Sequence, residues 1–197
     1  MALTLQPVSL TGQHVSLVPL SPDHAPALAD AARDGELWRL WYTTVPAPER
    51  MAHEIARRLE LLAANAMLPF TVLDASGTPV GMTTFMNVDA VTPRVEIGST
   101  WYAGRVQRTA LNTEAKRLLL DYAFESLHCV AVELRTHVLN TQSRRAIERL
   151  GASLDGVLRN HMRMPNGTLR DTVVYSIVES EWPTVRAHLT WQLEKGR

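Results

Sequence analysis

The stretch QRTALNTEAK, at residues 107–116, does most to decide the fold of this chain. It begins as a short polar loop and continues into an amphipathic helix, because Leu111, Ala115, Leu118 and Tyr122 recur at helical spacing. The N-terminus of a helix presents unpaired N–H groups and the positive end of the helix dipole, and both favour an anion. The stretch therefore predicts an anion-binding turn.

A strand leads directly into this loop. Residues 94–102 (RVEIGSTWY) have the pattern of a β-strand. Asn112 or Thr113 can cap the helix, which leaves the N–H groups from about Arg108 onward free to point at a phosphate. A strand, a loop with a basic residue and a helix N-terminus together form a pyrophosphate-binding arrangement. The alternative is an ordinary capped connection, since no glycine-rich nucleotide fingerprint is present.

The bulk composition indicates a soluble globular protein. With 197 residues, one domain spanning residues 1–197 is the default. The hydrophobic fraction of 46% and the charged fraction of 20% argue against disorder. Lys plus Arg and Asp plus Glu both number 20, so the net charge is +0 and no electrostatic footprint for a nucleic acid or an anionic membrane is present.

Cys129 is the one cysteine of the chain, which excludes an intrachain disulfide and a cysteine-based metal site. It begins a strand-like run, CVAVEL, where a small buried residue is favoured over a nucleophile. No spacing of His, Asp and Glu suggests a metal, and none is expected. The N-terminus lacks a basic segment followed by an apolar run, and no stretch approaches the roughly 18 apolar residues of a membrane span. The cytoplasm is therefore the expected compartment.

The remaining pattern predicts strands and helices in alternation, without a repeat or a dividing linker. In chain order we expect a strand at 14–20, a helix at 21–33, a helix after Pro48, strands at 70–74, 80–86 and 94–102, a helix from about 112, a strand from 129, a helix at 140–149, strands at 157–164 and 172–178, and a helix at 182–193. Hairpins are antiparallel and helical crossovers are parallel, so this order predicts an α/β sandwich with a mixed sheet.

Three segments carry a resemblance to a known family: VEIG at 95–98, QRTALN at 107–112 continued by TEA, and NTQS at 140–143 followed by AIERLGA at 146–152. They are similar to the acidic fourth strand, the Q/R-x-x-G-x-G/A loop and the N-x-x-S helix with its closing E-[KR]-L-G of the GCN5-related N-acetyltransferase (GNAT) superfamily. Over about residues 8–182 the chain resembles that superfamily, and most of all its branch of ribosomal-protein N-terminal acetyltransferases.

The resemblance implies a fold and a cosubstrate. The fold is α/β (α+β), with a mixed, mostly antiparallel sheet that splays between its fourth and fifth strands and is flanked by helices on both faces. The cosubstrate is acetyl-CoA, held in the splay. Ala110 and Asn112 stand where the family usually has glycine, or glycine and alanine. Asn tolerates left-handed geometry and Ala adds only a methyl group, so we expect coenzyme A binding to survive. The sequence does not say how far these residues weaken it.

The same resemblance assigns the cofactor contacts. The pantetheine arm would run along the strand at Trp101 and Tyr102, and the pyrophosphate would meet the loop amides, with the Arg105 and Arg108 guanidiniums as further donors. The residues expected to contact coenzyme A are Trp101, Tyr102, Gln107, Arg108, Thr109, Ala110, Leu111, Asn112, Thr113, Asn140 and Ser143.

Acyl transfer to an amine needs a base, a donor for the carbonyl oxygen and an acid for the departing thiolate. Glu96 is the candidate base, acting through a water, and the alternative is a strand glutamate paired with Arg94 or another cation. Asn140 fits a pantetheine contact or a plain helix cap. Ser143 is the candidate proton donor, or an ordinary first-turn serine. The tyrosine that many relatives carry seven residues after the Asn is replaced by Ile147.

The acceptor would lie near Trp38, Trp41 and Tyr42, between the first two helices, where aromatic rings hold an amine or plug the core. His161 is a secondary candidate for acceptor contact, as is Asp171.

The leading hypothesis is an acetyl-CoA-dependent N-acetyltransferase acting by direct attack on a primary amine, either a protein N-terminus or a small molecule. The alternatives are a non-catalytic acyl-CoA-binding sensor module, favoured by the altered loop, and an interaction domain without a cofactor. The sequence leaves the acceptor and the oligomeric state open, a homodimer included.

Overall fold

The computed structural model describes residues 3–195. The strands within that range are β1 (Leu10–Thr11), β2 (Val15–Pro19), β3 (Met67–Asp74), β4 (Pro79–Asp89), β5 (Arg94–Tyr102), β6 (Ala131–His137), β7 (Ser153–Arg163) and β8 (Leu169–Val178). The α-helices are α1 (Ala25–Arg33), α2 (Met51–Ala63), α3 (Ala110–Asp121), α4 (Thr141–Glu148) and α5 (Trp182–Glu194), and a π-helical turn, η5 (Tyr122–Ser126), extends α3. Short 3₁₀ turns are η1 (Pro22–His24), η2 (Leu37–Arg39), η3 (Pro48–Arg50), η4 (Gly104–Val106) and η6 (Glu179–Glu181).

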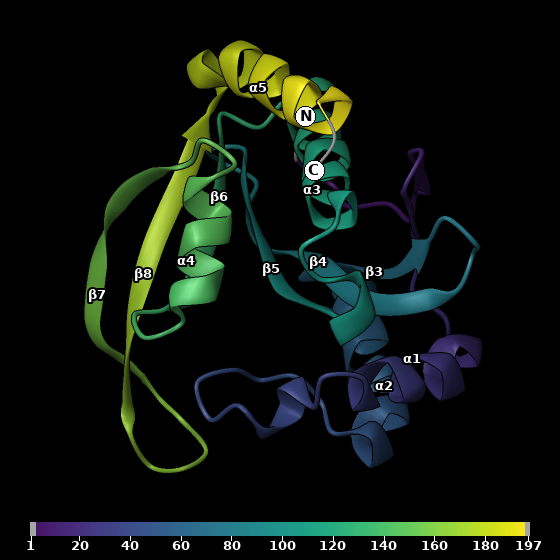
Figure 1. Cartoon of the computed structure of the whole chain (residues 1–197). Helices are drawn as coiled ribbons and strands as arrows, with labels where there is room; N and C mark the ends of the chain where they lie inside the picture. Colours follow the sequence, from purple (N-terminus) through teal and green to yellow (C-terminus); the bar gives the residue numbers. More distant parts are fainter. Residues whose placement is uncertain (1–2, 196–197) are drawn as a thin grey trace.

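These elements form a single eight-stranded sheet in the order β1-β2-β3-β4-β5-β6-β8-β7. Neighbouring strands are antiparallel except β5 and β6, which are parallel. Helices α1 and α2 pack against β4 and β3, whereas α3 packs on α5 and β2, so helices cover both faces of the sheet (Figure 1). The mixed, mostly antiparallel sheet and the order of the larger elements confirm the predicted fold class.

The sheet opens between β5 and β6. The two strands pair only at Arg94, Val95 and Glu96, although β5 continues to Tyr102 and β6 to His137. On its other edge β5 has a β-bulge, because two residues stand opposite Thr83 of β4. One of them, Ser99, has a φ of 48°. Since a bulge bends its strand and increases the local twist, β5 turns away from β6 beyond Glu96. This splay is the one predicted between the fourth and fifth main strands.

Gly98 makes the close packing beside the bulge possible. A Cβ atom at this position would lie 2.7 Å from Glu96 Oε1 and 2.7 Å from Met86 Sδ. Because contacts this short are essentially never found for a Cβ atom, a larger residue would push the Glu96 carboxylate out of place. The glycine that follows the acidic residue in VEIG therefore has a packing role.

Helix α3 begins earlier than we predicted. Its first residue is Ala110, and Thr109 caps it: the Thr109 hydroxyl accepts a hydrogen bond from the Leu111 N–H at 3.3 Å. The prediction that Asn112 or Thr113 caps this helix is wrong. A cap needs extended backbone, which Thr109 has, whereas Asn112 already lies in the first helical turn.

The other differences lie at strand boundaries. In the last hairpin β7 begins at Ser153 and β8 begins at Leu169. Both strands start a few residues before the predicted positions, 157 and 172. Exposed polar residues and Gly156 obscure the period-two pattern in β7, which lies at the edge of the sheet. The two-residue strand β1 was not predicted. No helix among residues 3–195 has the length and apolar character needed to cross a bilayer.

Glu114 anchors the β1–β2 turn to α3 from a buried position. Its carboxylate accepts hydrogen bonds from the backbone N–H groups of Gln13 (3.0 Å) and His14 (2.5 Å). It also fills the space beside Gly12, where a Cβ atom would lie 2.4 Å from the Glu114 Cδ. The N-terminal hairpin is therefore fixed to the helix by one side chain.

We expect Glu114→Ala to lower the free energy of unfolding by about 2–4 kcal/mol, because it leaves two backbone donors without an acceptor and opens a small cavity. Denaturant titration measures this, with the exposed Glu60→Ala on α2 as the control, for which we expect a change within about 0.5 kcal/mol. Equal stability of the two variants would contradict the anchoring role.

Candidate active site

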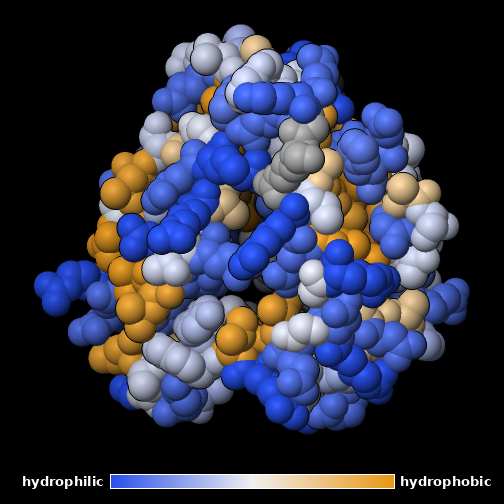
Figure 2. Space-filling view, in the orientation of Figure 1, coloured by the Kyte–Doolittle hydropathy of each residue, from blue (hydrophilic) through white to orange (hydrophobic). Residues whose placement is uncertain are grey.

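The splay between β5 and β6 opens into a cleft with a volume of about 630 Å³. One side is formed by β5 and the N-terminus of α3, and the other by β6, the N-terminus of α4 and the β7–β8 hairpin. Residues 37–45, between α1 and α2, close one end. Figure 2 shows the surface hollowed between these two halves of the molecule.

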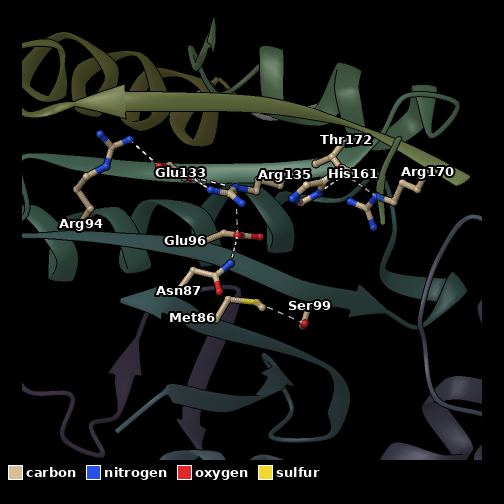
Figure 3. A network of polar contacts seen from close by, with 10 residues as sticks. All are labelled: Met86, Asn87, Arg94, Glu96, Ser99, Glu133, Arg135, His161, Arg170 and Thr172. Atoms are coloured by element: carbon tan, nitrogen blue, oxygen red, sulfur yellow. Dashed lines mark hydrogen bonds and ion pairs between the residues drawn. The ribbon is translucent and has the colours of Figure 1, made fainter. Parts of the chain in front are cut away.

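Glu96 lies inside this cleft at the last paired position of β5, with 7% of its surface exposed. The Asn87 Nδ2 donates a hydrogen bond to Glu96 Oε2 at 2.7 Å, and the Arg135 Nε lies 3.5 Å from the same oxygen (Figure 3). Burial raises the pKa of the Glu96 carboxyl, against the opposing effects of Asn87 and Arg135. A carboxylate with a raised pKa in a cleft is suited to accepting a proton near neutral pH.

The loop before α3 also borders the cleft, which Gln107, Arg108 and Thr109 line. Within the described chain, the backbone N–H groups of Arg108 and Thr109 donate to no other group. Arg108 has a φ of 60°, so the left-handed residue of this loop is an arginine. The loop is held by Gln107, whose Nε2 donates to the Tyr102 carbonyl at 3.0 Å. Free N–H groups next to a helix N-terminus form an anion-binding turn.

Asn140 faces the same cleft from the start of α4. Its Oδ1 accepts a hydrogen bond from the Ser143 N–H at 3.1 Å, which caps the helix. Among residues 3–195, nothing accepts a hydrogen bond from its Nδ2, and the Ser143 hydroxyl likewise has no partner. Both predicted roles of Asn140 are thus compatible with one geometry, because the oxygen caps the helix and the nitrogen stays free toward the cleft.

An acetyltransferase (GNAT) domain model matches residues 14–153 of the chain. The chain belongs to the GNAT acetyltransferase family. The resemblance stated from the three sequence segments is therefore confirmed, and the splay, the acidic β5 and the loop before α3 are the features of a GNAT acetyltransferase.

Individual relatives agree with this assignment. Over 106 residues the chain is 36% identical to the protein named putative ribosomal N-acetyltransferase YdaF of Bacillus subtilis (strain 168). That match covers 54% of this chain and 57% of YdaF, so the chain spans a little over half the length of this curated relative. A GCN5-related N-acetyltransferase from Brucella melitensis superposes with a TM-score of 0.86 and 28% identity, covering 96% of this chain and 87% of that one.

A third relative shares the fold. RimJ of Mycobacterium smegmatis, solved in complex with CoA-disulfide, has a TM-score of 0.77 and 22% identity and covers 95% of this chain and 93% of that one.

The residues predicted to contact coenzyme A can now be placed relative to the cleft. The residues that line the cleft are Trp101, Tyr102, Gln107, Arg108, Thr109, Asn112, Asn140 and Ser143. Ala110, Leu111 and Thr113 do not line it. Leu111 is buried in the core and its N–H is used by the Thr109 cap, and the Thr113 hydroxyl accepts from Arg149 at 3.0 Å.

Two further expectations about charged groups are corrected by the structure. Arg105, expected as a phosphate donor, pairs with Asp34 at 3.4 Å and does not line the cleft. Arg94, considered as a partner of Glu96, instead pairs with Glu133 at 2.6 Å. The other cation that the alternative allowed is Arg135, whose Nε lies 3.5 Å from Glu96 Oε2. Arg105 and Arg94 each pair with a carboxylate from a distant segment of the chain, and the local sequence does not reveal that neighbour.

The predicted aromatic acceptor cluster is divided. Of the three residues, Tyr42 lines the cleft, whereas Trp38 and Trp41 do not. Trp41 and Tyr42 both lie edge-on to the ring of His137, at 5.3 and 6.3 Å between centroids. His161 lines the cleft, and its Nδ1 is 3.1 Å from the Thr172 hydroxyl. Asp171 does not line it, and its carboxylate accepts a hydrogen bond from the Asn160 N–H at 2.7 Å.

Several residues of the cleft were missed by sequence reasoning: Arg58, Asn87, Lys116, Arg135, His137 and Arg170. Lys116 had a usable signal, because it follows Asn112 by one helical turn and so shares its face. Its Nζ donates to the Thr100 hydroxyl at 3.0 Å, and burial lowers its pKa to about 7. The others come from distant segments that carry no motif.

Cys129 has the environment that we predicted. It is buried just before β6, and burial raises the pKa of its thiol to about 11, so the thiol stays protonated at neutral pH. Among the described residues, no group of three or more His, Cys, Asp or Glu side chains is placed to hold a metal ion.

Proposed function

We propose that this GNAT protein transfers the acetyl group of acetyl-CoA to a primary amine by direct attack in a ternary complex. The observation that carries the proposal is the pairing of two features in one cleft: a buried carboxylate with a raised pKa, and a loop of free N–H groups. The first is suited to remove a proton from an amine, and the second to bind a diphosphate.

The residues fit coenzyme A in their chemistry. The N–H groups of Arg108 and Thr109 and the Arg108 guanidinium would hold the pyrophosphate. Beyond Glu96, the edge of β5 toward β6 has no strand partner, so its backbone groups near Trp101 are open to a pantetheine amide. The Asn140 Nδ2 is a further donor on the opposite side. RimJ, which has the same fold, was solved with CoA-disulfide.

Acetyl-CoA, when bound, supplies a thioester carbonyl and a thiolate leaving group. Glu96 takes a proton from the acceptor ammonium through one water, and the freed nitrogen attacks the carbonyl carbon. A backbone N–H of β5 past the bulge donates to the carbonyl oxygen as negative charge develops there. The C–S bond breaks, and the Ser143 hydroxyl passes a proton to the sulfur while taking one from solvent. The nitrogen gives its second proton to solvent as the amide forms, and Glu96 then returns its own proton to solvent, so the amide, the free thiol and one net proton are the products.

The acceptor is an amine, on a small molecule or at a protein N-terminus. YdaF is named as a ribosomal N-acetyltransferase, which favours a ribosomal-protein N-terminus as one member of the test panel. Such a substrate would place the reaction in the cytoplasm.

A thiol-release assay with acetyl-CoA and a broad amine panel tests this function. We expect turnover with at least one amine and acetyl-CoA binding by calorimetry. Binding without turnover on any amine would favour the acyl-CoA sensor instead. One argument for the sensor is weaker than the sequence suggested, since Ala110 and Asn112 lie in α3 and neither has a positive φ. Absence of binding would overturn both functions.

We expect Asn140→Ala to raise the KM for acetyl-CoA about fivefold, through loss of roughly 1 kcal/mol of hydrogen bonding. The matched control is Asn140→Asp, which keeps the capping oxygen and removes the Nδ2 donor. Both variants should raise KM, but only the alanine variant should also lower the free energy of unfolding, by about 1 kcal/mol, because it loses the helix cap. A KM that is unchanged in Asn140→Asp would remove the cofactor contact.

A further inference from the structure

Among the arginines that line the cleft, Arg170 forms no ion pair with a carboxylate of the described residues. Arg170 of β8 lines the cleft and donates through its Nε to the Thr172 hydroxyl at 3.0 Å. No ion pair joins it to any residue that the structure describes, and its two terminal N–H₂ groups are unused. Burial lowers its pKa, so the charged guanidinium is partly removed from water without a counter-ion in contact.

The charges around Arg170 leave an excess of positive charge beside Glu96. Arg135 binds Glu133 through its Nε (3.0 Å) and Nη2 (2.6 Å), and Arg94 binds the same glutamate at 2.6 Å. Glu133 is therefore shared by two arginines, and Glu96 is left to face both Arg135 and Arg170 (Figure 3). Three arginines face two glutamates in this network. The excess grows when Glu96 accepts a proton.

His137 provides a second unmet donor at the same end of the cleft. The Leu139 N–H donates to its Nδ1 at 3.0 Å, so the neutral ring carries its hydrogen on Nε2. That Nε2 is buried and has no hydrogen-bond partner among the residues that the structure describes. Burial and the nearby Arg170 charge both lower the pKa of His137, which keeps the ring neutral at neutral pH. The rings of Trp41 and Tyr42 lie edge-on to the His137 ring.

We propose that the acceptor carries a carboxylate close to its amine, and that Arg170 binds this carboxylate while the amine meets Glu96. The terminal N–H groups of Arg170 are the donors, and the unpartnered His137 Nε2–H lies at the same end of the cleft. This inference rests on the proposed function and specifies its substrate class: an amino acid, or a peptide whose first residue is acidic. Leu37, Leu40, Tyr42 and Val45 line the adjoining wall and suit an apolar substituent.

The same arrangement explains why a carboxylate near the amine assists the reaction. The anion neutralises the excess charge of Arg170, and so it offsets the desolvation cost of the guanidinium in the cleft. It also fixes the amine at one distance from Glu96, which lowers the entropic cost of reaching the reactive geometry. An amine without an anion would leave Arg170 without a counter-ion in the cleft.

The test uses the full chain with matched acceptors that differ only in the carboxylate. Phenylalanine is compared with phenylalaninamide, and the amidated peptide Asp-Ala-Ala with Asn-Ala-Ala. The variants are Arg170→Met, Arg170→Lys, and Arg159→Met as a control at an exposed arginine of β7 that does not line the cleft. Both kcat/KM from thiol release and the Kd of each acceptor in the presence of coenzyme A are measured, the latter by calorimetry.

We expect the wild-type chain to prefer the carboxylate member of at least one pair by about tenfold or more, as a charged hydrogen bond implies. Arg170→Met should lower kcat/KM and affinity for that member by about ten- to a hundredfold and leave its neutral partner within about threefold. Arg170→Lys should lie between, and Arg159→Met should match the wild type. Preference in the first pair identifies a free amino acid, and preference in the second an acidic N-terminus.

Three results would overturn the inference. In the first, the wild type shows no preference for the carboxylate acceptor of either pair. In the second, Arg170→Met lowers kcat/KM equally for charged and neutral acceptors. In the third, Arg170→Met changes only the pH dependence of kcat and leaves acceptor preference as in the wild type. Failure of the proposed function is separate. If no acceptor releases thiol, the transferase proposal fails, and the calorimetric preference and its response to Arg170→Met still decide whether Arg170 binds a carboxylate.

Discussion

Replacing Glu96 with glutamine is expected to lower kcat about a hundredfold or more at neutral pH while the Kd for acetyl-CoA stays within about twofold. The change removes the proton acceptor and keeps the size of the side chain, so the packing against Gly98 and Met86 is retained. Stopped-flow or steady-state thiol release measures kcat, and calorimetry measures Kd.

The pH profile makes this prediction specific. Burial raises the pKa of Glu96, and in the proposed mechanism the carboxylate is the active form, so wild-type kcat should fall as the pH decreases through that raised pKa. The Asn87 hydrogen bond opposes the shift, because it stabilises the carboxylate. Asn87→Gly removes this donor, and glycine tolerates the φ of 48° at the position. This variant should move the acidic limb to higher pH.

Two outcomes would contradict the role of Glu96 as the base. The first is an acidic limb that persists unchanged in Glu96→Gln. The second is a limb that moves to lower pH in Asn87→Gly. Arg159→Met again serves as a control, since its exposed side chain lies outside the cleft and should leave both limbs in place.

The main parts of the fold could be predicted because their signals are local. The strand at 94–102, the helix after it and the Asn140 cap each combine periodicity with a boundary residue a few positions away. The start of α3 was misplaced for a local reason as well. The residue types at 109, 112 and 113 can all cap a helix. The backbone geometry selects Thr109, and the sequence alone does not reveal that geometry.

The site was harder to predict because its electrostatics are not local. Glu96 could be proposed from VEIG, but its contacts come from Asn87 on β4 and Arg135 on β6. Arg170 lies 74 positions further along the chain and interacts with Glu96 only because β8 packs beside β6. Neighbours of this kind follow from sheet order, so they become visible once the register of the strands is known.

Lys116 leads to the second large effect, on stability. It is 6% exposed, its hydrogen-bond partner is the Thr100 hydroxyl, and no carboxylate pairs with it among residues 3–195. Thr100 also contacts the Thr83 hydroxyl at 2.8 Å, so it keeps a partner if the lysine is removed. Methionine has a similar length and an apolar side chain. Lys116→Met therefore removes a buried amine without leaving an unsatisfied group in its place.

The sign of the effect follows from the pKa. Burial lowers the pKa of Lys116 from 10.5 to about 7, so the unfolded chain binds the proton more tightly than the folded one. Below pH 7 both states carry the charge, and the folded state bears the full desolvation penalty. Between pH 7 and about 10.5 the folded amine is neutral, so wild-type stability rises with pH in this window.

Lys116→Met should thus raise the free energy of unfolding by about 2–4 kcal/mol at pH 6, and its advantage should shrink below about 1 kcal/mol near pH 10. Denaturant titrations at pH 6, 8 and 10 measure the difference. The chain offers a matched control, because its other lysine, Lys195, lies exposed at the end of α5, and Lys195→Met should change stability by less than about 0.5 kcal/mol at every pH. A Lys116→Met variant that is less stable than the wild type at pH 6, or an advantage that does not vary with pH, would show that the amine is well solvated or paired in the folded chain and does not carry the desolvation penalty.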